Sequence, residues 1–501
     1  MAEATAPVVR TYGNWRRPTS PGLLGLGTVG TALLFVSMFL VLIAMMTGGL
    51  VPALVVAVVC GGALAVLVVK DADGRSVLSR VGNRVGWWSA RSQGSHLYRS
   101  GPLGCTQWGT FQLPGIAAAT RLSEHEDAYG RKFALLYVPV SRTYVVVLAA
   151  EPDGASLVDQ DQVDHWVADW GHWLANLSGE PGLEAAGVTV ETAPESGARL
   201  RREVELHVDP QAPTFAQEML KDVVETYPAG SSSVKAYVTL TFAAAARRGG
   251  PARSSEEMAR DLSSRLPGLV ADLQATGAGA ARPVPARELC ELVRVAYDPV
   301  VATVLDEALA LGQQTDLLWS DVGPVAAEAT WDGYRHDSAW SVTWAMTQAP
   351  RGNVQSGVLS RLLAPHRDIA RKRVTLLYGM IDPGRAAGLV EADLRAAEFR
   401  ASSTRRPQAR DSLAVRSAAA SASEEASGAG LVNFSILVTA TVVDPAKLPE
   451  ARAAIDNLTA ASRLRVRPVY GSQDSAFVMA LPLGLVPKKH SQVPSEFRDS
   501  L

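Results

Sequence analysis

The densest group of titratable side chains begins at residue 159 of this 501-residue chain. Asp159 and Asp161 form a DxD pair, which some sugar-nucleotide enzymes use to hold a divalent cation through carboxylate oxygens. Asp161, His165, Asp169 and His172 recur at three- and four-residue intervals, so on a helix they would form one row of potential metal ligands. No supporting motif occurs elsewhere, and acids at a helix start are equally explained by the helix macrodipole. We therefore interpret the row as a solvated helix face and expect no metal and no cofactor.

A GxGxxG sequence formed by Gly25, Gly27 and Gly30 has the spacing of a pyrophosphate-binding turn. It opens an uncharged apolar segment and no strand precedes it, so close packing between helices explains these small residues better. The chain also lacks GxxxxGK(S/T), GxSxG, HExxH and EF-hand sequences. We expect a protein that is not an enzyme. The enzymatic alternative is a membrane-linked glycosyltransferase that uses Asp159 and Asp161.

Basic residues gather in the run Arg371-Lys372-Arg373 and at Arg405-Arg406. Neither cluster is interleaved with base-stacking aromatic residues, and the chain balances 48 basic against 50 acidic residues. We therefore do not expect nucleic-acid binding. Arg199, Arg201 and Arg202 are interpreted as a charged row on a strand edge, where such residues discourage aggregation.

The three cysteines show no disulfide or metal pattern. Cys60 lies in an apolar segment, while Cys105 and Cys290 are isolated and have no CxxC or Cys/His spacing around them. This usage fits a reducing compartment.

Residues 23–69 contain no charged residue, and Thr47-Gly48-Gly49 divides them into two apolar segments, Leu23–Met46 and Leu50–Val69. Each segment has about the 20 residues that a helix needs to cross a hydrocarbon core. The short connection predicts a transmembrane helical hairpin. Positive residues precede the first segment and follow the second, so we expect the N-terminus and the main domain on the cytoplasmic side of the plasma (inner) membrane.

An amphipathic helix is expected directly after the second span. Val77, Val81, Val85 and Trp88 recur on one face, and arginines occupy the adjacent face. Such a helix is typical of the membrane interface, where tryptophan sits at headgroup level and arginine meets anionic lipid. The alternative is an ordinary amphipathic helix packed on the first soluble domain. The expected membrane-interface residues are Arg80, Arg84, Trp87, Trp88 and Arg91.

Beyond this helix, β-branched and aromatic runs alternate with amphipathic helical patterns. We expect strands at Phe133–Tyr137, Tyr144–Ala149, Gly187–Thr192, Arg202–Val208, Val234–Phe242, Val325–Trp331, Ala339–Gln348, Arg371–Met380, Leu431–Val443 and Leu464–Tyr470. We expect helices at Gln160–Leu177, Pro213–Tyr227, Ser254–Gln274, Pro285–Tyr297, Val301–Leu311, Val354–Leu363 and Pro445–Ser462, with one or two long exposed helices in the Ala/Arg/Glu-rich stretch 383–426. The alternation predicts an α+β fold of ferredoxin-like modules with a long helical segment.

These patterns suggest seven parts of the chain. They are a cytoplasmic tail (1–22), the transmembrane hairpin (23–69), a juxtamembrane helix with an irregular segment (70–130), a first α+β domain (131–282), a second α+β unit (283–382), an Ala/Arg-rich helical segment (383–430) and a C-terminal βαβ unit with its tail (431–501).

Four stretches resemble actinobacterial membrane proteins of conjugation-type secretion. They are Tyr12-Gly-Asn-Trp-Arg-Arg-Pro18, His96-Leu-Tyr-Arg-Ser-Gly-Pro102, Arg294-Val-Ala-Tyr-Asp-Pro299 and Ala480-Leu-Pro-Leu-Gly484. The front hairpin is similar to the two-helix PrgI-type subunit of type IV secretion, and the body is similar to the N-terminal, non-motor part of the traffic ATPase. The motor half is missing from this chain, so no catalytic residue can be carried over.

The resemblance implies a non-enzymatic inner-membrane scaffold on which a separately encoded P-loop ATPase docks. Its expected partners are membrane lipid, that ATPase and further subunits in a homo- or hetero-oligomer, with the helices of 383–426 and the juxtamembrane helix as docking surfaces. The same layout also resembles the peripheral two-helix subunit of type VII secretion membrane complexes, an alternative that the oligomeric state would separate.

Overall fold

The computed structural model describes residues 10–13, 15, 27–68, 77–102, 104, 110–152, 154, 158–195, 197–230, 232–245, 250–350, 352–403 and 409–490. It divides into two compact units. The body comprises residues 1–14 and 96–489, and the anchor unit comprises residues 15–95 and 490–501.

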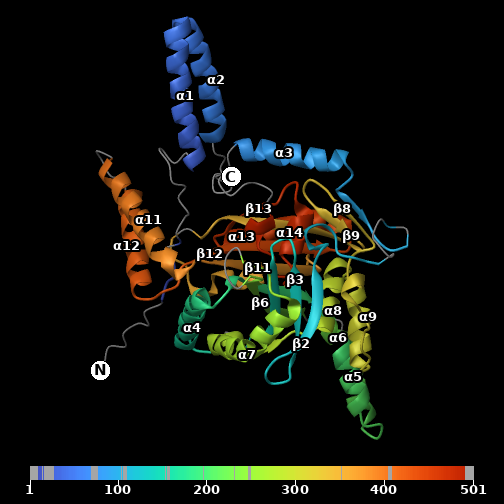
Figure 1. The fold of residues 1–501 in the computed structure, drawn as a ribbon. Coiled ribbons are helices and arrows are strands. Elements are labelled where there is room, and N and C mark those ends of the chain that lie inside the picture. The colour runs from blue at the N-terminus through green and yellow to red at the C-terminus, as the bar shows by residue number, and fades with distance from the viewer. Residues whose placement is uncertain are drawn as a thin grey trace, which may run out of the picture. The chain divides into compact units, whose positions relative to one another are not determined.

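The described part of the anchor unit between residues 27 and 92 forms the helices α1 (Gly27–Gly48), α2 (Leu50–Val68) and α3 (Val77–Ser92) (Figure 1). Gly49 makes the turn between α1 and α2 with φ +80°, a left-handed conformation that favours glycine. Helix α1 packs along α2, while most of their large apolar side chains remain exposed. Within the described part of the chain, Gly30–Gly48 is the one helix long and apolar enough to cross a membrane, and the apolar part of α2, Leu50–Ala65, is shorter.

The body is built on one continuous antiparallel sheet. Its main order is β1-β8-β9-β10-β12-β11-β5-β6-β4-β3-β2, with β7 beside β4 and β13 beside β10. The segments 131–282, 283–382 and 383–430 that we distinguished in the sequence, and residues 431–489 of the last one, contribute to this one body rather than each forming a sheet of its own. The mixture of helices and antiparallel strands confirms the α+β class.

Two modules with the same connectivity make up the sheet. In module 1 the order along the sheet is β7-β4-β6-β5, and in module 2 it is β13-β10-β12-β11, with every neighbouring pair antiparallel. A helix follows the first and the third strand of each module, so both have the βαββαβ connectivity of a ferredoxin-like unit. Module 1 consists of β4 (Thr143–Glu151), α4 (Gln160–Gly179), β5 (Leu183–Pro194), β6 (Ser232–Ala243), α7 (Ser255–Leu273) and β7 (Ala280–Pro283). Module 2 consists of β10 (Ala339–Gln348), α10 (Ser360–Leu363), β11 (Arg371–Met380), β12 (Val432–Val442), α13 (Leu448–Ala461) and β13 (Arg465–Pro468).

The remaining strands extend both ends of the sheet. β2 (Arg121–Glu126) and β3 (Lys132–Val138) continue module 1, and β1 (Leu97–Arg99), β8 (Ala326–Ala329) and β9 (Tyr334–His336) continue module 2. Module 1 is followed by α8 (Ala286–Tyr297) and α9 (Val301–Ala310), and module 2 by α14 (Gln473–Met479) and α15 (Pro487–His490). The modules meet where β5 pairs with β11.

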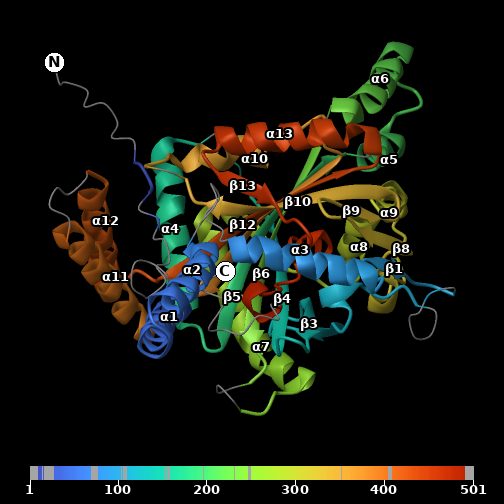
Figure 2. The same cartoon turned by 90° about the horizontal axis from the view of Figure 1, so that it is seen from above.

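Each module also carries a helical hairpin between its second and third strands. In module 1 it is α5 (Ala198–His207) with α6 (Thr214–Gly230), and in module 2 it is α11 (Pro383–Ser403) with α12 (Ala409–Ala426) (Figure 2). The two helices predicted within 383–426 are therefore present, and they pack on each other.

Two local predictions are wrong. The strand expected at Arg202–Val208 is helix α5, because the Arg- and Glu-rich run has high helix propensity and gains the turn-spaced pairs Arg202–Glu205 and His207–Glu203. The arginines of this run consequently lie on a helix and not on a strand edge. The helix expected at Val354–Leu363 is shorter, with a 3-10 turn at Ser356–Leu359 followed by α10, because Val354 instead pairs with another segment of backbone.

One face of the central strands buries a group of threonines beside apolar residues of the core. This group consists of Thr189, Thr239, Thr241, Thr343, Thr375, Thr439 and Thr441. The C-terminal segment covers them: the Gln473 amide bonds both backbone groups of Thr343, and the Thr241 hydroxyl donates to the Gly484 carbonyl at 2.8 Å. The C-terminal segment of the same chain therefore packs against this face and provides hydrogen-bond partners for polar groups on it.

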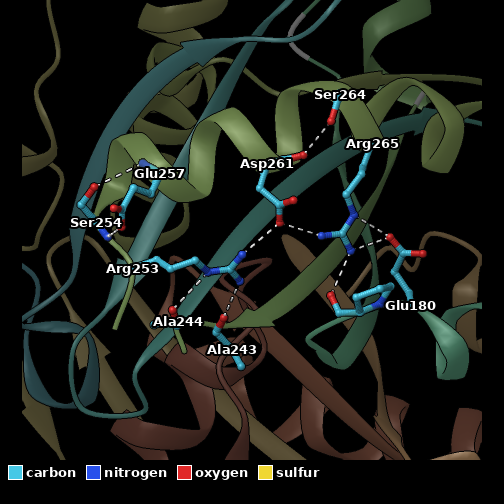
Figure 3. A network of polar contacts seen from close by, with 10 residues as sticks. Glu180, Ala243, Ala244, Arg253, Ser254, Glu257, Asp261, Ser264 and Arg265 are labelled. Atoms are coloured by element: carbon cyan, nitrogen blue, oxygen red, sulfur yellow. Dashed lines mark hydrogen bonds and ion pairs between the residues drawn. The ribbon is translucent and has the colours of Figure 1, made fainter. Parts of the chain in front are cut away.

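An ionic network ties α7 to α4 and β6 within module 1 (Figure 3). Asp261 accepts hydrogen bonds from Arg253 at 3.1 Å and from Arg265 at 2.8 Å. Arg265 also pairs with Glu180 at the end of α4, and Arg253 donates to the carbonyls that end β6. The helix is thereby tied to both of its neighbours.

Candidate membrane-anchoring site

Helix α3 carries all five residues expected at a membrane interface. Trp88 is 72% exposed, Trp87 is half-buried, and Arg80, Arg84 and Arg91 are exposed. The guanidinium carbons of Arg84 and Arg91 lie 6.0 and 5.3 Å from the centre of the Trp87 ring, within cation–π range. The structure thus brings the predicted tryptophans and arginines together on one helix.

Among the described residues of the anchor unit, none covers the apolar side of α3. Val81, Val85 and Trp88 form a row at four- and three-residue spacing, and all three are exposed. Helix α3 contacts α2 but does not bury this row against it. An exposed apolar row beside arginines can partition into the boundary between headgroups and acyl chains.

A short segment before the anchor helices docks on the body. Tyr12 forms a β-bridge with Val354, in which each backbone N–H donates to the other residue's carbonyl at 2.7 Å. The Asn353 amide also donates to the hydroxyl of Thr11 at 3.3 Å. Residues 10–13 therefore belong to the body although α1 and α2 follow them in the chain.

Asp164 on α4 receives this segment. Its carboxylate is buried and accepts hydrogen bonds from the Tyr12 hydroxyl at 3.1 Å and from Gln160 at 3.0 Å. Arg10 approaches the second oxygen at 3.8 Å. Burial and the hydrogen bond to Asp164 raise the pKa of Tyr12, so its hydroxyl stays protonated and remains a donor at neutral pH.

Sequence reasoning missed both Tyr12 and Asp164 as contact residues. Asp164 lies in the densely charged helix, but off the row formed by the acids and histidines. No local signal distinguishes it, because residues two positions apart on a helix point in nearly opposite directions, so Trp166 does not place Asp164 on the core face. Trp170 and Trp173 of the same helix pack in the module 1 core as expected.

The possible metal ligands on α4 are not gathered into a site. Asp159 and Asp161 are exposed at the helix start, and His165, Asp169 and His172 are exposed along it. Among the residues that the structure describes, no group of three or more metal-ligating side chains lies close enough to hold an ion.

The basic run 371–373 lies on β11, and its side chains are largely buried and not exposed to solvent. Arg373 donates from Nε to Glu191 at 2.9 Å, Arg371 pairs with the same carboxylate, and Lys372 bonds the carbonyl of Ala364. Burial disfavours the charged Glu191, but the two guanidinium groups outweigh it and hold its pKa at about 2. Arg405-Arg406 lies outside the described residues.

The cysteines and the GxGxxG glycines noted in the sequence do not form a reactive or ligand-binding group among the described residues. Cys290 is buried in the core, and burial raises the pKa of its thiol to about 12, so it is not a reactive thiolate. Cys60 lies in α2, and Cys105 is outside the described residues. Of the GxGxxG glycines, Gly27 and Gly30 are in α1, and Gly25 is outside the described residues.

With this geometry in place, the comparison with protein families gives one finding. Residues 19–79 match a domain of unknown function, DUF8461. The match includes α1 and α2 with their connection and ends within the first turn of α3. A comparison with curated proteins finds no match to the chain.

Proposed function

We propose that this protein is a non-enzymatic membrane scaffold whose α1–α2 hairpin enters and leaves the bilayer on the cytoplasmic side. The observation that carries the proposal is the docking of residues 10–13 on the body through Tyr12, Val354 and Asp164. The chain leaves the body at this segment and rejoins it at His96. If α1 crosses a membrane, the chain must cross back before His96, and α2 is the apolar helix placed to do so.

Two further observations support the hairpin. The match to DUF8461 spans both helices, which fits one module that includes the pair. Positive residues flank the hairpin while its connection at Gly49 carries none, and this charge distribution favours cytoplasmic flanks. The apolar part Leu50–Ala65 of the second helix is short for a membrane span. The whole helix, Leu50–Val68, has 19 residues and would extend about 28 Å at 1.5 Å per residue.

Cysteine labelling in intact cells tests this topology. Gly49→Cys should react with a membrane-impermeant maleimide from outside, because it lies in the turn on the far side of the bilayer. Ala4→Cys and the exposed body variant Val140→Cys should react only after the cells are lysed. Labelling of the body from outside, or of only one of Ala4→Cys and Val140→Cys, would contradict the hairpin.

We further propose that the body docks a separately encoded P-loop ATPase of a type IV secretion- or conjugation-like system. The α11–α12 hairpin supports a docking role because it packs mainly on itself and leaves much of the length of both helices exposed. A helical pair without a core of its own must meet solvent or a partner. Helix α3 remains the lipid contact of the same scaffold.

Purification from the native host tests the docking. The full-length protein in mild detergent should bring down an ATPase with a GxxxxGK(S/T) sequence, and deletion of residues 383–428 should abolish its recovery. Monodisperse elution of the deletion variant would establish that it remains folded. Equal recovery of the ATPase with and without the hairpin would reject α11–α12 as the docking surface, and recovery of lipids and chaperones alone would reject the scaffold.

A further inference from the structure

The two helical hairpins leave the body at opposite ends. Each follows the second strand of its module, and these strands, β5 and β11, pair in antiparallel orientation. Their C-terminal ends therefore point in opposite directions. Both views show the consequence, with α5–α6 on one side of the sheet and α11–α12 on the other (Figures 1 and 2).

Helix α6 presents an uncovered apolar row. Phe215, Met219 and Val223 follow one another at four-residue spacing and are 71%, 57% and 43% exposed. Leu220 beside them is 40% exposed. Among the described elements, α6 packs mainly on α5. The exposed charges of α6 are mostly acidic, with Glu218, Asp222 and Glu225 against Lys221.

The free end of the α11–α12 hairpin also carries large exposed apolar side chains. Phe399 near the end of α11 is 72% exposed, and Leu413 near the start of α12 is 63% exposed. The sequence around them is basic: Arg395, Arg400, Arg405, Arg406, Arg410 and Arg416 stand against Glu398 and Asp411. The α6 face and the free end of α11–α12 thus each combine large exposed apolar side chains with charge: α6 is acidic, and the sequence around the free end of α11–α12 is basic.

We propose that the acidic apolar face of α6 in one copy of this protein binds the basic end of α11–α12 in the next copy. Burial of Phe215, Met219 and Val223 against Phe399 and Leu413 would remove apolar surface from water at both ends of the molecule. Complementary charge fixes which surfaces meet and disfavours α6–α6 contacts.

Such a contact is head-to-tail, because two different surfaces of the chain meet. A head-to-tail contact generates a ring if the rotation between copies closes and a filament if it does not. The contact itself does not depend on the proposed membrane topology. Closure into a ring does depend on the proposed membrane topology, because anchoring in one bilayer keeps all copies in the same orientation.

Disulfide trapping in the native membrane tests the contact directly. Two differently tagged full-length populations, with the three native cysteines replaced by serine, are expressed together, one with Met219→Cys and the other with Phe399→Cys. Mild oxidation should join the two tags. Neither variant should link to itself, and Val234→Cys, an exposed control on β6, should link to neither. Dominant Met219→Cys self-links, or links from Met219→Cys only to another protein, would overturn the proposal.

Charge exchange supplies a second test that a folding defect cannot mimic. Glu218→Arg with Asp222→Arg, or Arg395→Glu with Arg400→Glu, should each weaken self-association in detergent by about tenfold or more, and combining all four changes should restore it. Failure of the combined variant to recover, when every variant elutes as a folded monomer, would reject the contact.

The α6 variants also separate this proposal from ATPase docking. These variants leave α11–α12 intact. If they abolish self-association but the ATPase is still recovered, the α6 contact sets the number of scaffold copies and is not needed for ATPase docking. Self-association without any recovered ATPase would leave the α6 contact standing and reject the docking role.

Discussion

Thr189 of β5 and Thr375 of β11 face each other at the junction of the two modules, with their Oγ1 atoms 3.2 Å apart. They occupy the same place in their modules, because Val188 pairs with Val238 in module 1 as Val374 pairs with Val438 in module 2. A pseudo-two-fold axis therefore passes between the two threonines. It relates the sheets of both modules and the positions of their hairpins.

The C-terminal segment makes the two threonines unequal. The Thr375 hydroxyl donates to the Ala480 carbonyl at 2.8 Å, so Thr189 is the donor in the bond between the threonines. Thr375→Val would leave the Ala480 carbonyl without this bond, and we expect a loss of about 2 kcal/mol in the free energy of unfolding. Thr189→Val removes only the Thr–Thr bond and should cost under about 1 kcal/mol.

Urea unfolding followed by tryptophan fluorescence measures this difference. The two substitutions are matched in chemistry, burial and strand position, so packing of the added methyl group largely cancels in the comparison. Equal losses would mean that the covering segment does not use the Thr375 hydroxyl.

His336 predicts a fall in stability in mild acid. Burial lowers its pKa to about 4, although its Nδ1–H bond to the Tyr297 carbonyl opposes this shift. The unfolded histidine titrates near 6.5, so below that pH the unfolded state takes up a proton that the folded state excludes. Stability should be unaffected above pH 6.5 and fall by up to about 3 kcal/mol between pH 6.5 and 4.

His336→Asn keeps a donor for the Tyr297 carbonyl and removes the titration. Its unfolding free energy should depend less on pH between 6.5 and 4 than that of the unchanged protein. Parallel curves for His336→Asn and the unchanged protein from pH 6.5 to 4 would contradict the assignment to His336.

The salt-bridged Glu191, whose pKa is held at about 2, should give a separate loss in the free energy of unfolding between pH 4.5 and 2. Glu191→Gln should abolish this pH dependence.

Much of the secondary structure follows from local patterns. The strands at Ala339–Gln348 and Arg371–Met380 lie where predicted, because their β-branched and aromatic residues admit few alternatives. The strand prediction for Arg202–Val208 was wrong because the polar–apolar alternation of this segment competes with the helix propensity of Arg, Glu and Leu. Period alone could not decide between the two.

The pairing of β5 with β11 could not be predicted from the same patterns. Thr189 and Thr375 look like solvent-facing positions of half-buried strands, and only the covering segment from Gln473 makes them buried. Strand neighbours that are distant in sequence leave no signal in either strand alone. The same reason hid Asp164, whose partner Tyr12 lies on the other side of the anchor helices in the sequence.

The Tyr12–Asp164 contact predicts a releasable N-terminal segment. Asp164→Ala removes an acceptor of two hydrogen bonds, and a hydrogen bond to a charged group contributes about 1.5–3 kcal/mol. We expect faster hydrogen exchange at the Tyr12 and Val354 amides, by about one to two orders of magnitude on this estimate. Asp169→Ala on the exposed side of the same helix is the control and should leave both amides protected.

The arginines of α3 predict a preference for anionic lipid. Val85→Cys places an environment-sensitive dye within the exposed apolar row, and full-length protein is reconstituted in neutral vesicles or in vesicles containing anionic phospholipid. Each arginine near an anionic surface contributes about 1 kcal/mol, so the anionic vesicles should shift the dye emission further to the blue. Changing Arg80, Arg84 and Arg91 together to Gln should remove the extra shift, as should high salt, because both eliminate the attraction to headgroups. Arg99→Gln, an exposed arginine of the body, should retain it. A dye that reports water in both kinds of vesicle would instead favour α3 as a helix that packs on protein.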